Sequence, residues 1–524
     1  MTAPGTTASK SRYLALVAML FAVAMTFIDQ TIVSIATPRI QDELALTRGG
    51  VQWVVNGYIL ALAAGFAFGG RLADVIGSKR MVLIGIAGFA GTSALCGATP
   101  KGSLAETWIV FFRVVQGFSA AVMIPAALAV VVSSFPLRER GRALAIFFGV
   151  SGGLTAIGPI AGGYLTQWTW RAIFWINVPI AVVAIVIAVM AKITTAGRRE
   201  PIDYRGAVLA AAGMGLSVFG FEQASSWGWS NIGTWLCIVG GLVIIVVFVL
   251  VQTRTEFPLI KVQIFHDRAF VVDNVVLFFS MIAFVPVFFF ASVYSQVSLG
   301  YDANNAGLYL LVFFGGFAPA AQIGGRILDS RGAKPAIVAG SAIGAVGFAL
   351  WAIQLTNLQL GAQWYAIVLA GAGIGLLLGP SSTDAVNRAI GASYGEVTGI
   401  SQTVRNYGSA LGLAVLGTLL GNVFTTRLTT TFVGAGVPAD QAGAAAAAAA
   451  SSSTGGSGSG APSGFPAAAV QQIRAAIPQD FAVATRAVLI GMSIALAISL
   501  VAAFFHPGGV VTHEKPAVEP VTAG

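Results

Sequence analysis

The chain has 524 residues, of which 56% are hydrophobic and only 9% are charged. A soluble globular protein carries roughly 25% charged residues, so this composition excludes a soluble enzyme, a disordered chain and a fibrous protein. The formal net charge of +9 is attributed to basic residues in the loops of a membrane protein, not to nucleic-acid binding. The sequence therefore predicts an all-α integral membrane protein with no nucleic-acid partner.

Histidine and cysteine are too scarce for a Cys/His metal site. The chain has three histidines (His266, His506 and His513) and two cysteines (Cys96 and Cys237), and neither cysteine belongs to a C-x-x-C pair. No Walker P-loop is present, so ATP is not expected to drive the protein. We expect no metal, no cofactor, no catalytic residues and no structural disulfide.

Fourteen stretches are long and apolar enough to cross a bilayer, whose core of about 30 Å needs roughly 20 residues of helix. They begin near residues 13, 51, 81, 105, 142, 172, 206, 233, 270, 304, 335, 363, 397 and 483. The first stretch lacks a small-residue cleavage site and is expected to stay as a span. With the N-terminus inside, 20 basic residues fall on the cytoplasmic side and 7 outside, while Arg113 and Arg405 lie within spans. This asymmetry predicts fourteen spans with both termini in the cytoplasm.

One long connection separates the last two spans on the outer side, at about residues 422–480. Its centre is a low-complexity run of alanine, serine and glycine, which cannot bury enough apolar area to order itself. Its flanks, residues 439–450 and 467–476, are compatible with short surface helices. We expect a solvated loop with a peripheral role.

Asp29 stands out because ionisable residues inside spans are costly and usually functional. It lies in the outer half of the first span. A carboxylate in a low-dielectric cavity can exchange a proton near neutral pH, as a proton-coupled carrier requires. Asp29 is therefore expected to carry the coupling proton or to bind a cationic substrate. The alternative is a permanent structural ion pair with an arginine such as Arg113.

A polar motif occurs twice, as GGRLADVIGSKR at Gly69–Arg80 and as GGRILDSRGAKP at Gly324–Pro335. Four residues of the first copy recur 255 positions later in the second copy. These pairs are Arg71/Arg326, Asp74/Asp329, Gly77/Gly332 and Lys79/Lys334. The first copy also contains Gly70 and Arg80. The glycine permits a tight turn, and the aspartate can pair with arginine or accept from the amides of a neighbouring helix. An ordinary positive-inside loop explains the basic residues alone, but the repeated pattern predicts two homologous bundles, as in secondary transporters.

The first copy resembles the cytoplasmic signature loop of the major facilitator superfamily. Other segments resemble its fourteen-helix drug:proton antiporter family, the EmrB/QacA type. These segments are Phe27–Ile40, Gln52–Ala63, Arg113–Gly117, Gly158–Gly163 and Trp170–Ile180. The resemblance implies a major facilitator fold with an N-terminal six-helix bundle at 1–195, two inserted helices at 196–262 and a C-terminal six-helix bundle at 263–524.

The resemblance also implies roles for two groups of residues. Arg113 would modulate a nearby carboxylate during proton transfer and Gln116 would join its hydrogen bonds, although a helix-locking ion pair explains the same residues. A glycine-rich fifth span marks exporters within this family, although alone it is a packing motif. The residues of this motif are Gly149, Gly153, Gly158, Pro159, Gly162 and Gly163. The family has further glycines where this chain has Leu154 and Thr155.

A few other residues complete the inventory of the spans. Arg405 in span 13 matches an arginine of the family, whereas Asp273 and Glu222 are expected to be solvated near the membrane interfaces. No further carboxylate is expected deep in the C-terminal bundle, which disfavours export of divalent cations. Aromatic residues crowd spans 9 and 10 and suit flat lipophilic molecules, although they also suit contact with lipid or core. The residues expected to line a substrate cavity are Asp29, Tyr294, Phe313 and Arg405.

These features favour a proton-driven exporter of lipophilic small molecules in a bacterial cytoplasmic membrane. It would work as a monomer by alternating access, with the proton gradient as its energy source. An exporter of a lipid or of a dedicated secondary metabolite would share these motifs. A proton-coupled uptake symporter is disfavoured by the fifth span, and a non-transporting scaffold by the polar residues within spans.

Overall fold

The computed structural model describes residues 4–135, 143, 146–147, 150, 157–191, 201, 203–256, 258–260, 262–388, 394–453 and 467–509. Within these ranges the chain forms sixteen α-helices and two short 3₁₀-helices, and the one β-type pairing is a bridge between Gly332 and Gly509. Thirteen helical segments are long and apolar enough to cross a membrane. The predicted all-α membrane fold is confirmed. The expected fifth span falls largely on residues 136–156, mostly outside the described part, so the count of fourteen stays a prediction.

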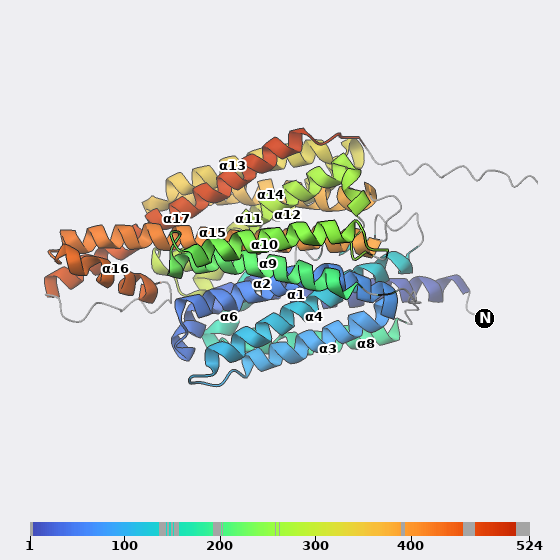
Figure 1. Cartoon of the computed structure of the whole chain (residues 1–524), viewed down its shortest axis with the longest axis horizontal. Coiled ribbons are helices and arrows are strands. Elements are labelled where there is room, and N and C mark those ends of the chain that lie inside the picture. The colour runs from blue at the N-terminus through green and yellow to red at the C-terminus, as the bar shows by residue number, and fades with distance from the viewer. Residues whose placement is uncertain are drawn as a thin grey trace, which may run out of the picture.

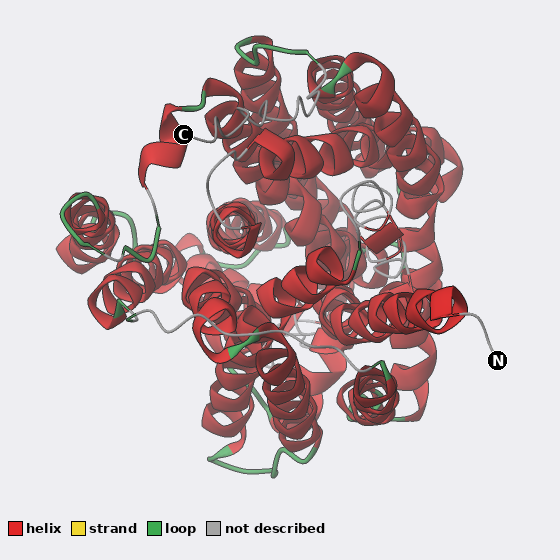
Figure 2. Ribbon diagram, turned by 90° about the vertical axis from the view of Figure 1, so that its right-hand side faces the viewer, coloured by secondary structure: helices red, strands yellow, loops and turns green. Residues whose placement is uncertain are grey.

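Two groups of helices lie side by side and run along a common axis (Figures 1 and 2). The first group is α1 (Pro4–Leu44), α2 (Arg48–Ile76), α3 (Ser78–Gly97), α4 (Ala105–Ser134), α6 (Ile157–Trp168), α7 (Ala172–Trp175) and α8 (Asn177–Met190). The second is η1 (Val262–His266), α11 (Arg268–Val297), α12 (Ala303–Arg331), α13 (Ala333–Gln354), η2 (Leu355–Asn357), α14 (Leu360–Arg388), α15 (Tyr394–Gly434), α16 (Ala439–Ser453) and α17 (Ala467–Phe504). The groups meet where α1, α2 and α6 contact α11, α15 and α12 respectively.

The repeat seen in the two motifs extends to whole helices. Helices α12, α13 and α14 each begin 255 residues after α2, α3 and α4. The packing repeats as well, because a side chain at Gly69 of α2 would meet the carbonyl oxygen of Ala121 on α4, and one at Gly324 of α12 would meet that of Leu376 on α14. Small residues let helix backbones approach closely within a membrane. The two halves are therefore built on one packing scheme.

The remaining helices, α9 (Tyr204–Trp227) and α10 (Ile232–Gln252), pack on each other, and α9 contacts both halves. The hydroxyl groups of Ser217 on α9 and Tyr407 on α15 lie 2.7 Å apart. On the other side, the rings of Phe219 and Trp53 on α2 have centroids 6.2 Å apart. Helix α10 exposes much of its apolar surface, as a lipid-facing helix does. The division at residues 195 and 262 stays a prediction.

The connection at 422–480 differs from the solvated loop expected there. Helix α15 continues to Gly434, α16 forms a separate helix, and α17 already begins at Ala467. Both expected flanks are helical: 439–450 lies in α16, and 467–476 is the start of α17, which like the end of α15 projects at one end of the molecule (Figure 1). Phe432 and Ala446 are fully buried there, so apolar burial orders the extension. The low-complexity centre at 454–466 lies outside the described residues.

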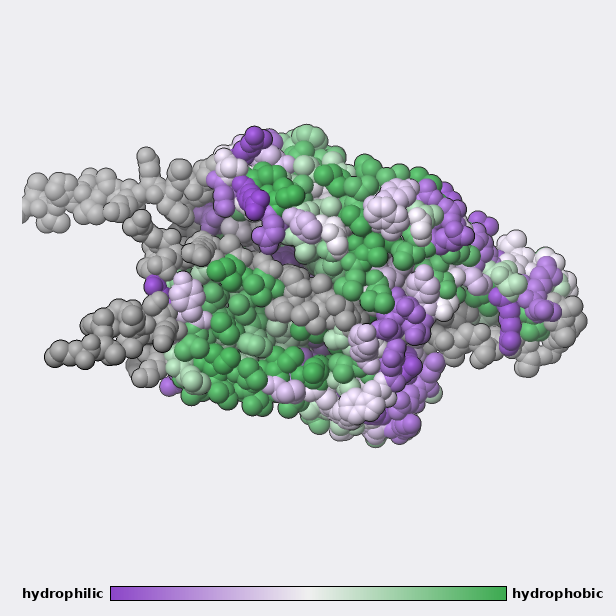
Figure 3. Space-filling model, turned by 180° about the vertical axis from the view of Figure 1, so that it is seen from behind, coloured by the Kyte–Doolittle hydropathy of each residue, from purple (hydrophilic) through white to green (hydrophobic). Residues whose placement is uncertain are grey.

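The surface matches a membrane setting. Hydrophobic residues cover a broad band along the length of the helices, and hydrophilic residues gather towards the end that carries the extension (Figure 3). Helix α1 begins and α17 ends at the opposite end of the molecule (Figure 1). Assigning that end to the cytoplasm stays a prediction from the basic residues.

Candidate functional site

The expected polar residues of spans 1 and 4 form one closed triad. Arg113 Nη1 lies 2.5 Å from Asp29 Oδ2 and donates to Gln116 Oε1 at 2.9 Å, while Gln116 Nε2 donates to Asp29 Oδ1 at 3.1 Å. All three side chains are at most 1% exposed. Asp29 lies close to the middle of the apolar segment Ser11–Leu44, just past its midpoint.

Further contacts fix the guanidinium group of Arg113. Its Nε donates to the carbonyl oxygen of Val54 on α2 at 2.8 Å, and its Cζ lies 4.3 Å from the ring centroid of Tyr58. The face of an aromatic ring attracts a cation, most strongly where both are desolvated. The triad therefore ties together α1, α2 and α4, and a change in the charge of Asp29 acts on all three helices.

A small cavity of about 20 Å³ lies between the two halves, next to the triad. It is lined by Phe27, Gln30, Leu62, Phe66, Ile124, Met281, Phe284, Val285, Gln402, Arg405, Asn406 and Ser409. A space of this size holds about one water molecule. Phe27 and Gln30 flank Asp29 on α1 but face the cavity, whereas Asp29 faces α4. The carboxylate therefore lies one helix face away from this small cavity.

The four residues expected in the substrate cavity are not brought together. Arg405 lines the cavity, and no hydrogen-bond partner of its Nε is found among the described residues. Tyr294 instead donates its hydroxyl to Leu355 O at 2.7 Å, and Phe313 packs within the aromatic core beside Phe284. Neither Tyr294, Phe313 nor Asp29 is among the lining residues. The crowded aromatics of spans 9 and 10 mostly build the C-terminal core.

The two signature loops share one turn geometry. Gly77 and Gly332, 255 residues apart, have φ values of 106° and 81°, which only glycine adopts freely, and each ends one helix and begins the next. Arg71 of the first loop donates to Pro201 O at 3.3 Å, ahead of α9. In the second loop Arg326 and Asp329 are exposed and Lys334 is half-buried. The positive φ values explain why glycine stands at both turns. A role of the charged residues in conformational change stays a prediction.

The glycine motif of span 5 lies against α1 as far as it is described. A Cβ atom on Gly158 would overlap Thr31 Oγ1 and lie 3.0 Å from Ile28 O. Gly162 and Gly163 are buried on the same helix, α6. Gly149 and Gly153 lie outside the described residues, as does the side chain of Pro159. Close contact between α6 and α1 thus depends on glycine within one turn of Asp29.

The expectation that Asp273 is solvated is wrong. Asp273 is 0% exposed and packs with Asp384, which is 2% exposed, and His506, which is 1% exposed. His506, which follows α17, lies beside Asp273 near the start of α11, an arrangement that the position of Asp273 on its own helix does not reveal. Asp384 and His506 were missed, although Asp384 falls within an apolar span and met the criterion that identified Asp29. The side chain of Glu222 is outside the described part.

Comparisons with known proteins agree with this architecture. The sequence profile described as the Major Facilitator Superfamily matches residues 19–413. The chain is 33% identical over 423 residues to the tetracenomycin C resistance and export protein of Streptomyces glaucescens, covering 79% of this chain and 77% of that protein. It is 34% identical over 415 residues to the cephamycin export protein CmcT of Amycolatopsis lactamdurans, covering 75% and 82%. A bacterial homologue of the human lysosomal transporter Spinster, solved in an inward-facing conformation, shares the fold with a TM-score of 0.56 at 15% identity, covering 94% and 96%.

Proposed function

Because the chain belongs to the Major Facilitator Superfamily, we propose that it is an efflux transporter driven by the proton gradient, which exports lipophilic small molecules by alternating access. It is a multi-pass protein of the bacterial cytoplasmic membrane and not an enzyme. No cofactor is needed, since the gradient supplies the energy, and one chain suffices as a monomer. Relatives named as export and resistance proteins support the direction of transport.

The observation that carries the proposal is the buried triad of Asp29, Arg113 and Gln116 beside a cavity between the halves. A proton on Asp29 removes the negative charge that holds the guanidinium of Arg113. Arg113 would then keep its bonds to Gln116 Oε1 and Val54 O and its contact with the ring of Tyr58, so the ties between α1 and α4 weaken. Proton binding thereby favours a different packing of the N-terminal helices, which is the differential interaction that coupling requires.

Substrate and proton bind at separate places in this mechanism. Phe27 and Gln30 present one face of α1 to the cavity, and Asp29 presents another face to α4. A substrate in the cavity therefore competes with the proton through the position of α1 and not through direct contact with the carboxylate. Each ligand shifts the other's affinity by the same factor, as linkage demands.

The lining of the cavity defines the substrate class that we propose. Most of it is apolar or aromatic, with amides and a hydroxyl from Gln30, Gln402, Asn406 and Ser409. Among the lining residues Arg405 is the charged one, and no acidic side chain lines the cavity described here. Apolar walls with few polar groups suit lipophilic molecules, and the guanidinium disfavours those that carry a positive charge. We therefore propose neutral or anionic lipophilic substrates.

A dedicated metabolite exporter is the second candidate function. Two relatives are each named for a single compound, tetracenomycin C and cephamycin. In that case the cavity opens to fit one molecule closely, and the same proton coupling drives the export of that molecule. A panel of compounds separates the two, because a multidrug carrier responds to several unrelated structures and a dedicated exporter to one.

The test uses inside-out vesicles that contain the full chain and hold an imposed proton gradient. Adding a substrate is expected to release protons from the vesicle lumen in the wild type and not in Asp29→Asn. The control is Asp302→Asn, since Asp302 is exposed and caps α12, a task that asparagine performs equally well. Normal, pH-responsive export by Asp29→Asn would overturn the coupling role of Asp29.

A further inference from the structure

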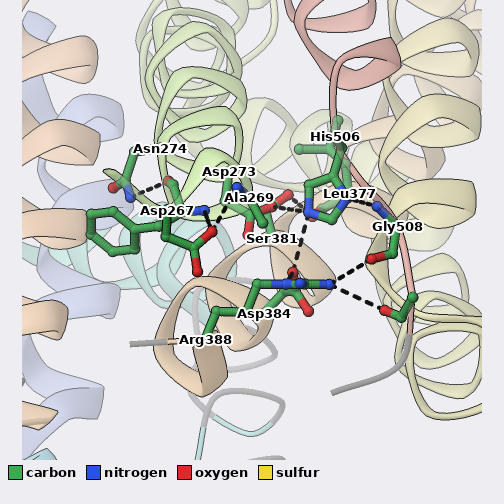
Figure 4. A network of polar contacts seen from close by, with 12 residues as sticks. Asp267, Ala269, Asp273, Asn274, Leu377, Ser381, Asp384, Arg388, His506 and Gly508 are labelled. Atoms are coloured by element: carbon green, nitrogen blue, oxygen red, sulfur yellow. Dashed lines mark hydrogen bonds and ion pairs between the residues drawn. The ribbon is translucent and has the colours of Figure 1, made fainter. Parts of the chain in front are cut away.

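A second buried ionic cluster lies in the C-terminal half, at the end of the molecule where α17 finishes (Figures 1 and 4). It joins Asp273 in the second turn of α11, Asp384 near the end of α14 and His506, which follows α17. His506 Nε2 lies 3.2 Å from Asp384 Oδ2 and 3.6 Å from Asp273 Oδ1. Arg388 Nε donates to Asp384 Oδ2 at 2.6 Å. The function proposed above does not use this cluster.

Asp273 is the unusual member, because neither of its carboxylate oxygens has a hydrogen-bond partner among the described residues. Its side chain is 0% exposed. A buried carboxylate without a compensating charge or hydrogen bond is strongly unfavourable. Something must therefore neutralise or pair this group.

The hydrogen bonds of His506 define its protonation in this arrangement. The backbone N–H of Gly508 donates to Nδ1 at 3.0 Å, so Nδ1 is a bare acceptor and the ring hydrogen is on Nε2, facing the carboxylates. The ring is then neutral. Two carboxylates, Asp273 and Asp384, face one guanidinium, Arg388, and leave one negative charge uncompensated.

Other charged groups of the surrounding helices do not supply the missing charge. Asp267, ahead of α11, accepts from the amides of Ala269 and Phe270. Arg268 is exposed, and Lys334 on α13 approaches Gly508 with its aliphatic stem. The helices that contact α11 and α14 thus leave the extra negative charge in place, as far as they are described.

We propose that Asp273, Asp384 and His506 form a second proton-binding site, which takes up one proton and thereby becomes electrically neutral together with Arg388. The proton resides on the carboxyl group of Asp273 when Gly508 donates to His506, and on the imidazole when Gly508 turns away. Gly508 and Gly509 have φ values of 78° and 87°, a region where glycine moves with little steric penalty. Burial by itself would lower the pKa of His506, but the hydrogen bonds and charges of Asp273 and Asp384 raise it to about 9.

The cluster belongs to one half of the molecule only. At the offset of 255 that relates the halves, Ala18 and Ala129 stand where the C-terminal half has Asp273 and Asp384. Conversely, the apolar Phe284 stands 255 positions after Asp29 in the sequence. Each half thus carries one ionisable cluster that its counterpart lacks. The proton binding proposed here is independent of transport, and only its consequence, a second exchanged proton, rests on the proposed function.

A divalent cation is the competing ligand, but the geometry favours a proton. A cation bound to Asp384 would lie beside the guanidinium group of Arg388, whose Nε donates to Asp384 Oδ2 at 2.6 Å, and the two positive charges would repel each other. The two ligands are distinguished by adding Zn²⁺ or Mg²⁺ at constant pH. A saturable, EDTA-reversible shift of the His506 signal would overturn the proposal in favour of a metal site.

The test follows ring-labelled histidine by NMR in the full chain in lipid nanodiscs between about pH 5 and 10. His506→Asn assigns the signal of His506 among the three histidines. We expect its titration midpoint to lie above the ordinary pKa of histidine, 6.5, by about one pH unit or more. Asp273→Asn should lower the midpoint by about one unit or more, and Arg388→Gln, which removes the positive charge, should raise it. Opposite shifts are not expected of a merely structural role.

Two controls make the outcome decisive. Asp267→Asn makes the same substitution just ahead of α11 and retains its capping function, so it should leave the midpoint unchanged. Asp29→Asn should also leave it unchanged, so a failure of the proposed function is separable from a failure of this site. If Asp273→Asn does not fold, Arg388→Gln still carries the test. A midpoint at or below 6.5 that Arg388→Gln leaves unmoved would overturn the proposal.

Discussion

Arg113 on α4 and Asp29 on α1, 84 positions apart in the chain, form an ion pair with Nη1 and Oδ2 only 2.5 Å apart and no access to solvent. Gln116 closes the arrangement by bonding to both partners. A buried pair of this kind holds together as long as both charges are present. A proton on the carboxylate therefore changes the packing of the helices as well as the local charge.

Removing one partner of this pair should destabilise the fold. Arg113→Gln leaves the carboxylate of Asp29 buried and unpaired, which costs roughly 3–5 kcal/mol in such pairs. The double variant Asp29→Asn/Arg113→Gln has no unpaired charge and should recover a large part of the loss. Thermal unfolding of the purified protein in one detergent measures all four combinations. Additive effects of the two substitutions would show that the residues do not interact.

Sequence reasoning found the triad of Asp29, Arg113 and Gln116 because each residue is an ionisable or amide group within an apolar span, a feature visible one helix at a time. The repeat was equally accessible, since two motifs at one offset predict matching helices. The cluster at Asp273 was not found in this way. It brings together residues from α11, α14 and the segment that follows α17, and no local pattern records these contacts. The same holds for the connection near 422–480, where the burial of residues such as Phe432 stabilises helices that continue beyond the spans.

Gly158, in the glycine motif of span 5, should tolerate no side chain. In Gly158→Ala the new methyl group would overlap Thr31 Oγ1 and approach Ile28 O. Helix α6 must then move away from α1, beside Asp29. We expect transport in vesicles to fall by about tenfold or more, which corresponds to roughly 1.4 kcal/mol. Gly91→Ala is the matched control, because no atom lies within 4 Å of the added group, and it should transport normally.

Arg405 should set the charge preference of the cavity. Replacing it with glutamine removes the positive charge from the lining and keeps hydrogen-bonding capacity. We expect the ratio of transport of a cationic dye to that of an anionic one to rise by about tenfold in Arg405→Gln, because a charge in a low-dielectric site acts strongly. Arg427→Gln changes an exposed arginine on the same helix and serves as the control. An unchanged ratio would show that substrates do not contact Arg405.

His506 should make the stability of the protein depend on pH. Its pKa is about 9 in the folded protein, because Asp273 and Asp384 outweigh the effect of burial, whereas the ordinary pKa of histidine is 6.5. A group whose pKa is higher in the folded than in the unfolded protein contributes its full stabilisation at pH values below its unfolded pKa. That contribution is lost as the pH rises through its folded pKa. The melting temperature of the wild type should therefore fall between about pH 6.5 and pH 9 more steeply than that of His506→Asn. His266→Asn removes an exposed histidine outside the cluster and should follow the wild type. Parallel curves for wild type and His506→Asn would mean that His506 does not take up a proton in this range.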